Sequence, residues 1–76
     1  IMTTLVAKGY TADDKPVYLW NKGSYEYEIQ TLVEGKSYRS SIEAFECDFE
    51  TAVLEFEERV VESTPIDWPG GSLTHH

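Results

Sequence analysis

Cysteine is almost absent from this sequence: Cys47 is the only one in 76 residues. A single thiol forms neither an internal disulfide nor a multi-cysteine metal site, so both kinds of small scaffold are excluded. Histidine occurs only as His75 and His76, which leaves Cys47 without a general base for nucleophilic catalysis. Its neighbours Glu46 and Asp48 are expected to raise the pKa of the thiol rather than lower it. We therefore interpret Cys47 as a small, buried, unreactive residue.

Basic residues are also scarce, with six Lys and Arg against 14 Asp and Glu and a formal net charge of -8. Binding to a phosphate backbone requires clustered Lys and Arg, so direct contact with nucleic acid is not expected. Docking on an anionic membrane is disfavoured for the same reason. No apolar run approaches the roughly 18 residues of a spanning helix, and no signal peptide is recognisable. These features predict a cytoplasmic protein whose partner is a protein with a basic surface.

Motifs that hold cofactors or metals are missing as well. Gly9, Gly23 and Gly35 are isolated, so no glycine-rich loop is present to hold a phosphate group. Asp13 and Asp14 lie in a turn-like segment and do not begin an EF-hand loop. No pair of carboxylates is singled out for acid–base catalysis. We therefore expect no enzyme activity, no cofactor and no specific metal site.

The first half of the sequence is typical of short strands separated by turns. The segment from Tyr25 to Val33 alternates between two sets of side chains, which is the strongest strand signal in the chain. Asn21–Ser24 and Glu34–Gly35 contain glycine and favour tight turns. We expect strands over residues 3–10, 17–20, 25–33 and 37–45.

The turn positions predict which side chains share a face of the sheet. A loop at Lys22–Gly23 pairs Trp20 with Tyr25, and a loop at Glu34–Gly35 continues the same face onto the next strand. The face so predicted comprises Tyr18, Trp20, Tyr25, Tyr27, Ile29, Ile42 and Ala44. We expect a helix to cover it, which argues against a platform for nucleic acid or sugar. Val17, Leu19 and Leu32 then belong to the opposite face.

An amphipathic helix is predicted from Phe49 to Glu62, with Asp48 as its N-cap and Pro65 beyond its end. Its apolar stripe consists of Phe49, Ala52, Val53, Phe56 and Val60. A competing interpretation starts the helix near Ser41, because the spacing from Ile42 to Phe56 also fits a helix. We favour a strand to about Phe45 and a helix from Asp48.

Together these elements predict an α+β fold: a three- to four-stranded antiparallel β-meander with one C-terminal amphipathic α-helix packed on one face. Residues 3–69 are expected to form a single small domain, with Trp68 packed back on it. Residues 70–76 are expected to be a disordered tail or tag remnant. Ile1 is interpreted as a vector remnant, and His75 and His76 as the start of a tag.

Acidic side chains are concentrated in and around the predicted helix, opposed only by Arg59. Such a one-sided bias favours an acidic surface for a basic partner. The predicted partner-binding residues are Glu46, Glu50, Glu55, Glu57, Glu58 and Glu62. The alternative hypothesis is a small homodimer or other homo-oligomeric accessory domain, held by Leu54, Val61 and the open face of the sheet.

In outline, the acidic β-meander followed by one helix, over roughly residues 3–62, resembles several small phage-encoded proteins, including some anti-CRISPR proteins, and uncharacterised bacterial domains. It is also similar in outline to the AP2-type DNA-binding domains, but those require a basic sheet. No family motif carries individual residues over. A specific form of the interaction hypothesis, motivated by the acidic cluster, is an inhibitor from a phage or mobile element that blocks a basic, nucleic-acid-handling surface.

Overall fold

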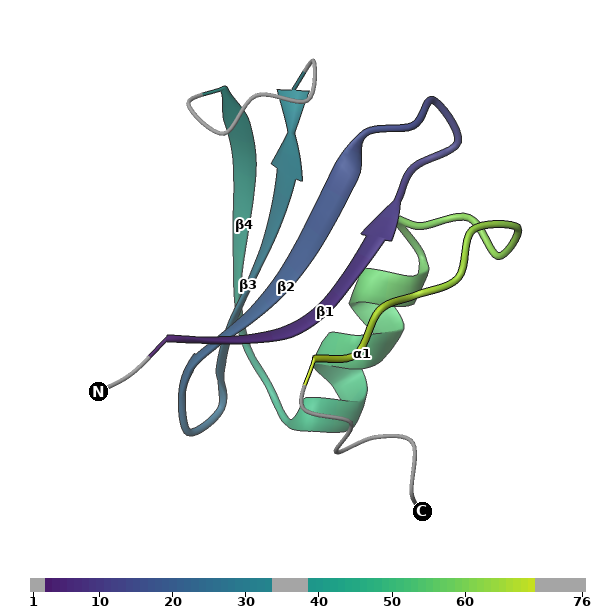
Figure 1. Ribbon diagram of the computed structural model, residues 1–76. Coiled ribbons are helices and arrows are strands. Elements are labelled where there is room, and N and C mark those ends of the chain that lie inside the picture. Colours follow the sequence, from purple (N-terminus) through teal and green to yellow (C-terminus); the bar gives the residue numbers. More distant parts are fainter. Residues whose placement is uncertain (1–2, 34–38, 70–76) are drawn as a thin grey trace.

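The structure is a computed structural model that describes residues 3–33 and 39–69. Four strands precede one helix: β1 (Thr4–Tyr10), β2 (Pro16–Gly23), β3 (Glu26–Leu32), β4 (Ser40–Glu46) and α1 (Phe49–Glu57). The strands pair antiparallel in the order β1-β2-β3-β4, and α1 packs on one face of the sheet (Figure 1). The predicted α+β meander with one C-terminal helix is confirmed, and the sheet has four strands.

The start of α1 is fixed by Asp48. Its Oδ1 accepts a hydrogen bond of 2.9 Å from the backbone N–H of Thr51, which satisfies one of the otherwise unpaired amides of the first turn. Glu50 adds a negative charge near the positive end of the helix dipole. Because β4 continues to Glu46 before this cap, the competing helix start near Ser41 is wrong.

The end of α1 differs from the prediction, because the helix stops at Glu57 and not at Glu62. No basic side chain lies in the last turn to complement the negative end of the helix dipole. The chain beyond the helix is held instead by the sheet, since Val61 donates a backbone hydrogen bond of 2.9 Å to the carbonyl of Tyr10. The backbone of Val61 is therefore bonded to β1 at a position where a longer helix would have formed another turn.

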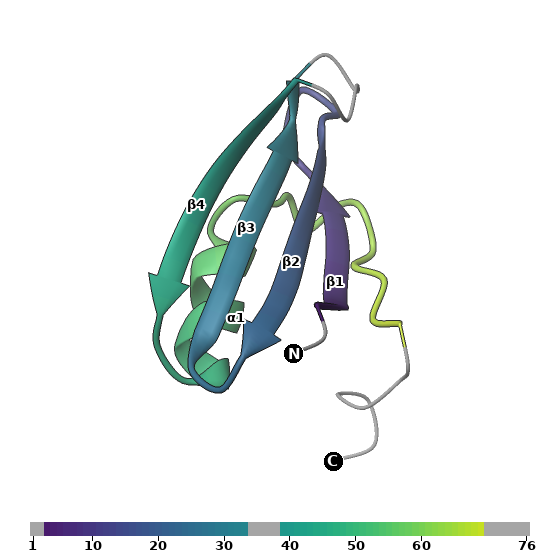
Figure 2. The ribbon, with the colours of Figure 1, turned by 90° about the vertical axis from the view of Figure 1, so that its left-hand side faces the viewer.

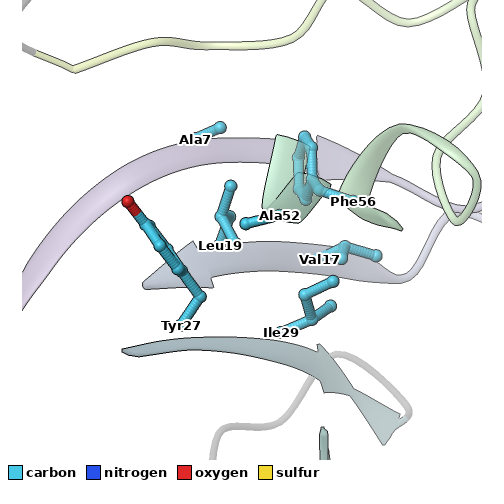
Figure 3. Packing of buried hydrophobic residues seen from close by; sticks show 7 residues of the cluster. All are labelled: Ala7, Val17, Leu19, Tyr27, Ile29, Ala52 and Phe56. Atoms are coloured by element: carbon cyan, nitrogen blue, oxygen red, sulfur yellow. The ribbon is translucent and has the colours of Figure 1, made fainter. Parts of the chain in front are cut away.

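The hydrophobic core lies between α1 and the sheet (Figure 3). Its seven buried members are Ala7, Val17, Leu19, Tyr27, Ile29, Ala52 and Phe56. Phe56 is fully buried, and the ring of Trp68 lies edge-on to it at 6.3 Å between centroids. The predicted return of Trp68 onto the domain is thus confirmed.

The predicted core face is wrong for β2. Leu19 pairs with Ile29, whereas Tyr18 pairs with Gln30, so Val17 and Leu19 enter the core. The turn lies at Ser24–Tyr25 and not at Lys22–Gly23, but a displacement by two positions alone leaves the faces unchanged. A one-residue bulge at Lys22, between the paired Asn21 and Gly23, exchanges them. Tyr18 and Trp20 therefore lie on the face that α1 leaves uncovered, which Figure 2 shows in front of the helix.

The prediction for β4 is wrong for a related reason. Tyr27 pairs with Phe45 and not with Ile42, because the connection from β3 to β4 is longer than two residues. Phe45 packs against the core, while Ile42 is 58% exposed and lies with Ala44 on the uncovered face. Tyr25, also predicted to be in the core, is 67% exposed in the turn. The assignments of Tyr27 and Ile29 to the core are confirmed.

Several expectations fall on residues outside the described ranges. These are the turn at Glu34–Gly35, the terminal residues 1–2 and the tail over residues 70–76. Within residues 3–33 and 39–69, no helix combines the length and apolar character needed to cross a membrane.

Candidate interaction surfaces

The outward side of α1 presents one apolar side chain among carboxylates. With 3.6 residues per turn, Glu50, Leu54 and Glu58 form one row and Glu57 lies beside it. Leu54 is 61% exposed, and the three carboxylates are exposed as well. We call this set, Glu50, Leu54, Glu57 and Glu58, the acidic helix face.

The carboxylates of this face are not neutralised within the described chain. In residues 3–33 and 39–69, the ion pairs formed by Lys and Arg involve only Asp13, Glu28, Glu43 and Glu55. These carboxylates are therefore open to a cationic partner.

Glu55, a predicted partner-binding residue, is instead engaged by Arg59. Nη1 of Arg59 lies 3.1 Å from Oε1 of Glu55, and Nη2 lies 2.8 Å from Oε1 of Glu43. Nε of Arg59 also donates to Oε2 of Glu43 at 3.1 Å, and the guanidinium lies 5.4 Å from the ring centroid of Phe45. The hydrogen bonds from Arg59 lower the pKa of Glu43, and Glu43 in turn raises the pKa of Arg59. Arg59 thereby ties α1 to β4.

The two remaining predicted residues lie apart from the acidic helix face. Glu46 is the last residue of β4 and pairs with Glu26 across the ladder. Glu62 follows the helix and lines a shallow hollow together with Glu57, Val61 and Ile66. Of the six predicted residues, the structure brings Glu50, Glu57 and Glu58 together on one face. Glu62 lies next to this face, because it lines the same hollow as Glu57.

The face of the sheet that α1 leaves uncovered, which we call the open sheet face, carries the polar and aromatic side chains of Lys8, Tyr10, Tyr18, Trp20 and Gln30. The sequence-based prediction placed Tyr18 and Trp20 on the other face. Nζ of Lys8 lies 5.3 Å from the ring centroid of Tyr10 and 5.6 Å from that of Tyr18. The ring of Trp20 follows at 6.1 Å from that of Tyr18. Hydrogen bonding to Tyr10 is the largest of the effects that raise the pKa of Lys8. The cation is therefore held between aromatic rings.

Hydrogen bonds continue this set across the sheet. Nε1 of Trp20 donates to Oε1 of Gln30 at 3.0 Å, and Nε2 of Gln30 donates to Oγ of Ser40 at 2.9 Å. Lys22 forms an ion pair of 3.0 Å with Glu28. The side chains of the open sheet face are therefore positioned by bonds that cross β2, β3 and β4. The alternation of Val17 and Leu19 with Tyr18 and Trp20 was the sequence signal that could have indicated that Tyr18 and Trp20 lie on the open sheet face.

Residues suited to covalent or metal chemistry are not assembled in the described part of the chain. Cys47 is half-buried and packs against the core. Burial is the first cause that raises the pKa of its thiol, followed by the charge of Asp48. Among residues 3–33 and 39–69, no three His, Cys, Asp or Glu side chains are grouped to hold a metal ion, and every buried side-chain N and O atom has a hydrogen-bond partner.

Two surfaces of different character thus lie on opposite sides of the sheet. The acidic helix face is on the α1 side, and the rings of Tyr18 and Trp20 are on the other, which is the face of the sheet turned to the viewer in Figure 2. Comparisons of the chain with protein-family models, with curated proteins and with solved structures find no match, so both surfaces are interpreted from their own residues.

Proposed function

We propose that this chain is a non-enzymatic, cytoplasmic protein–protein interaction module that binds a basic protein surface through the acidic helix face. One observation carries the proposal: exposed Leu54 lies among Glu50, Glu57 and Glu58, none of which is paired with a cation in the described chain. An apolar contact surrounded by charged residues is the usual arrangement of the centre and rim of a protein interface.

The two components of this face have different roles in binding. Leu54 supplies an apolar side chain that becomes buried from water in the complex. This burial determines how slowly the complex dissociates. The carboxylates attract a basic partner and exclude acidic ones, so they act mainly on the association rate and on specificity. The expected partner therefore has an apolar depression flanked by Lys and Arg side chains.

In its specific form, the proposal is an inhibitor from a phage or mobile element that blocks a surface which otherwise handles nucleic acid. The net charge of -8 supports this form, because such surfaces are positively charged and attract acidic competitors. Occupation by the acidic helix face would exclude the nucleic acid by competition for the same Lys and Arg side chains.

The test is a binding titration against candidate basic nucleic-acid-handling proteins at low and high salt. Affinity should fall as salt rises, because screening weakens exposed charge pairs. Glu57→Lys should weaken binding, and Glu26→Lys, an equal charge change on the sheet, should have a smaller effect. Leu54→Ala should weaken binding by about tenfold, the equivalent of about 1.4 kcal/mol. A salt-independent affinity, or equal effects of the two Glu variants, would refute the proposal.

A homo-oligomeric accessory domain is the second candidate. It is supported by Leu54 and Ile42, which are large exposed aliphatic side chains of the described residues. Val61 contributes less than the sequence suggested, because it is half-buried and its amide is bonded to β1. Light scattering after size exclusion separates the candidates: a monomer at every concentration would exclude this one.

A further inference from the structure

The two edges of the sheet are treated differently by the rest of the chain. The outer edge of β1 is paired at Lys8, because Lys8 and Asp67 exchange two backbone hydrogen bonds of 2.9 Å. The amide of Val61 covers the carbonyl of Tyr10 at the end of the same strand. β4 forms the other edge, and in the described residues no strand pairs with its outer side. Figure 2 shows β4 at this margin.

The outward backbone groups of β4 follow from the bonds at its two ends. The amide of Val33 donates to the carbonyl of Arg39 at 2.6 Å, and the amide of Cys47 donates to the carbonyl of Tyr25 at 3.1 Å. Antiparallel ladders alternate strictly between residues that point toward the neighbouring strand and residues that point away. The odd-numbered residues of β4 therefore bond to β3, and the even-numbered ones point outward.

The even-numbered residues of β4 are Ser40, which begins the strand, and then Ile42, Ala44 and Glu46; the amides and carbonyls of these last three face away from β3. In the described chain these groups have no hydrogen-bond partner within the protein. Their side chains all project on the open sheet face, where Ile42 is 58% exposed and Ala44 and Glu46 are exposed as well. An unpaired strand edge with this pattern is a template for one further strand.

The charges along this edge are uneven. Glu46 lies directly opposite Glu26, and two like charges at such a position destabilise the ladder. Lys22 is close in the same region, but its ammonium is paired with Glu28 at 3.0 Å. The free edge therefore presents two apolar residues, Ile42 and Ala44, followed by a carboxylate pair that lacks a cation among the described residues.

We propose that the free edge of β4 binds an extended peptide segment of a partner protein with the pattern basic–x–apolar–x–apolar, aligned antiparallel to β4. The basic side chain would lie beside Glu46 and Glu26, and the two apolar side chains beside Ala44 and Ile42. This surface is distinct from the acidic helix face, and the inference does not depend on the proposed function.

Two arguments select this occupant. In strand addition, main-chain hydrogen bonds supply affinity and alternate side chains supply specificity, and Ile42, Ala44 and Glu46 offer both. Charge complementarity then requires a cation at the Glu46 end. A second copy of this chain would instead bring together two molecules that each carry a net charge of -8, which opposes pairing of β4 with β4.

The experiment uses the whole chain and a fluorescein-labelled peptide, Ser-Arg-Thr-Val-Thr-Val-Thr-Ser. Anisotropy should report saturable binding, and replacement of Arg by Glu in the peptide should weaken it by at least about tenfold. In the complex, the amides of Ile42, Ala44 and Glu46 should exchange with deuterium at least about tenfold more slowly than in the free chain. N-methylation of the two Val amides should abolish binding, because they face β4, whereas N-methylation of the flanking Thr amides should preserve it.

Protein variants provide the matched control. Glu46→Lys should weaken binding by at least about tenfold, and Asp67→Lys, the same charge change at an exposed residue beside the opposite edge of the sheet, should leave it within about twofold. The proposal is overturned if the peptide does not bind, if both sets of N-methylated peptides bind equally, or if the three amides keep their exchange rates at saturation. Protection of the same amides that rises with protein concentration alone would identify a second copy as the occupant and would also overturn it.

Discussion

Gly9→Ala is a sharp test of how the segment after α1 packs against β1. Gly9 is buried in β1 opposite Val17. A Cβ atom at this position would lie 2.7 Å from Cγ1 and 3.1 Å from Cβ of Val60, and 3.4 Å from Cζ of Phe56. The first distance is far inside van der Waals contact, so either Val60 or the strand must move. Gly9 is required here for space.

The expected magnitude follows from two opposing effects. Insertion of a methyl group into a filled core costs about 1–3 kcal/mol. Replacement of glycine by alanine in an accessible backbone conformation stabilises by about 0.4–1 kcal/mol through the unfolded state. We therefore expect Gly9→Ala to lower the free energy of unfolding by about 1–2 kcal/mol. In a domain of this size, that corresponds to a decrease in Tm of roughly 4–16 °C.

A double-mutant cycle with Val60→Ala isolates the cause, because that change removes Cγ1. Val60→Ala alone should destabilise modestly, since Val60 is half-buried. In that background, Gly9→Ala should cost less than about 0.5 kcal/mol or become stabilising, which gives a coupling of about 0.5 kcal/mol or more. Urea denaturation followed by the fluorescence of Trp20 and Trp68 measures all four free energies. If Gly9→Ala costs the same with and without Val60, the assigned contact is wrong.

Three further changes are expected to alter the stability of the domain, each measurable by the same denaturation assay. Phe56→Ala should cost about 3–5 kcal/mol, because a fully buried ring leaves a cavity; a loss below about 1 kcal/mol would contradict its central place in the core. Tyr25→Gly should stabilise by about 1 kcal/mol, because Tyr25 has a left-handed φ of 57° that disfavours side chains with a Cβ; unchanged stability would show that the turn is not strained. Hydrogen bonds from Thr51 lower the pKa of Asp48 in the folded state, so its contribution is present above the unfolded pKa and is lost as pH falls through the folded pKa. Asp48→Asn should keep the cap and reduce this acid sensitivity, and an unchanged pH profile would refute the assignment.

The parts of the fold that sequence could predict are those set by neighbouring residues. Asp48 begins a helix because its side chain caps the first turn, and the alternation from Tyr25 to Val33 marks a strand whatever its neighbours are. The apolar stripe that includes Phe56 predicts which face of the helix packs on the core. These signals depend on local hydrogen bonds and side-chain periodicity, and they were sufficient to predict the α+β meander.

The faces of β2 and β4 could not be predicted, because they depend on counts of residues between strands. Because of one bulged residue, Lys22, it is Leu19 and not Tyr18 that faces the core. Because of the length of the connection before β4, it is Phe45 and not Ile42 that does so. Bulge positions and connection lengths are decided by which face buries more apolar surface in the assembled sheet. The consequence for the candidate site was large, since Tyr18 and Trp20, both expected inside, lie on the open sheet face.

The candidate site on α1 was predictable in part. Glu50, Glu57 and Glu58 follow from helical spacing alone. The engagement of Glu55 by Arg59 depends on β4 bringing Glu43 to the other side of the guanidinium, which local sequence does not reveal. Glu46 was grouped with the helix because it is close in sequence, although its backbone belongs to the edge of the sheet.

The two hydrogen bonds between Lys8 and Asp67 have a consequence for synthesis of the chain. During translation, β1 leaves the ribosome early, but Asp67 emerges only after the entire sheet and α1. Until then the outer edge of β1 has no partner and Phe56 lacks its contact with Trp68. The native arrangement is therefore completed after almost all of the described residues have been made. A message truncated before the codon for Asp67 would release a product with both margins of its sheet exposed to aggregation.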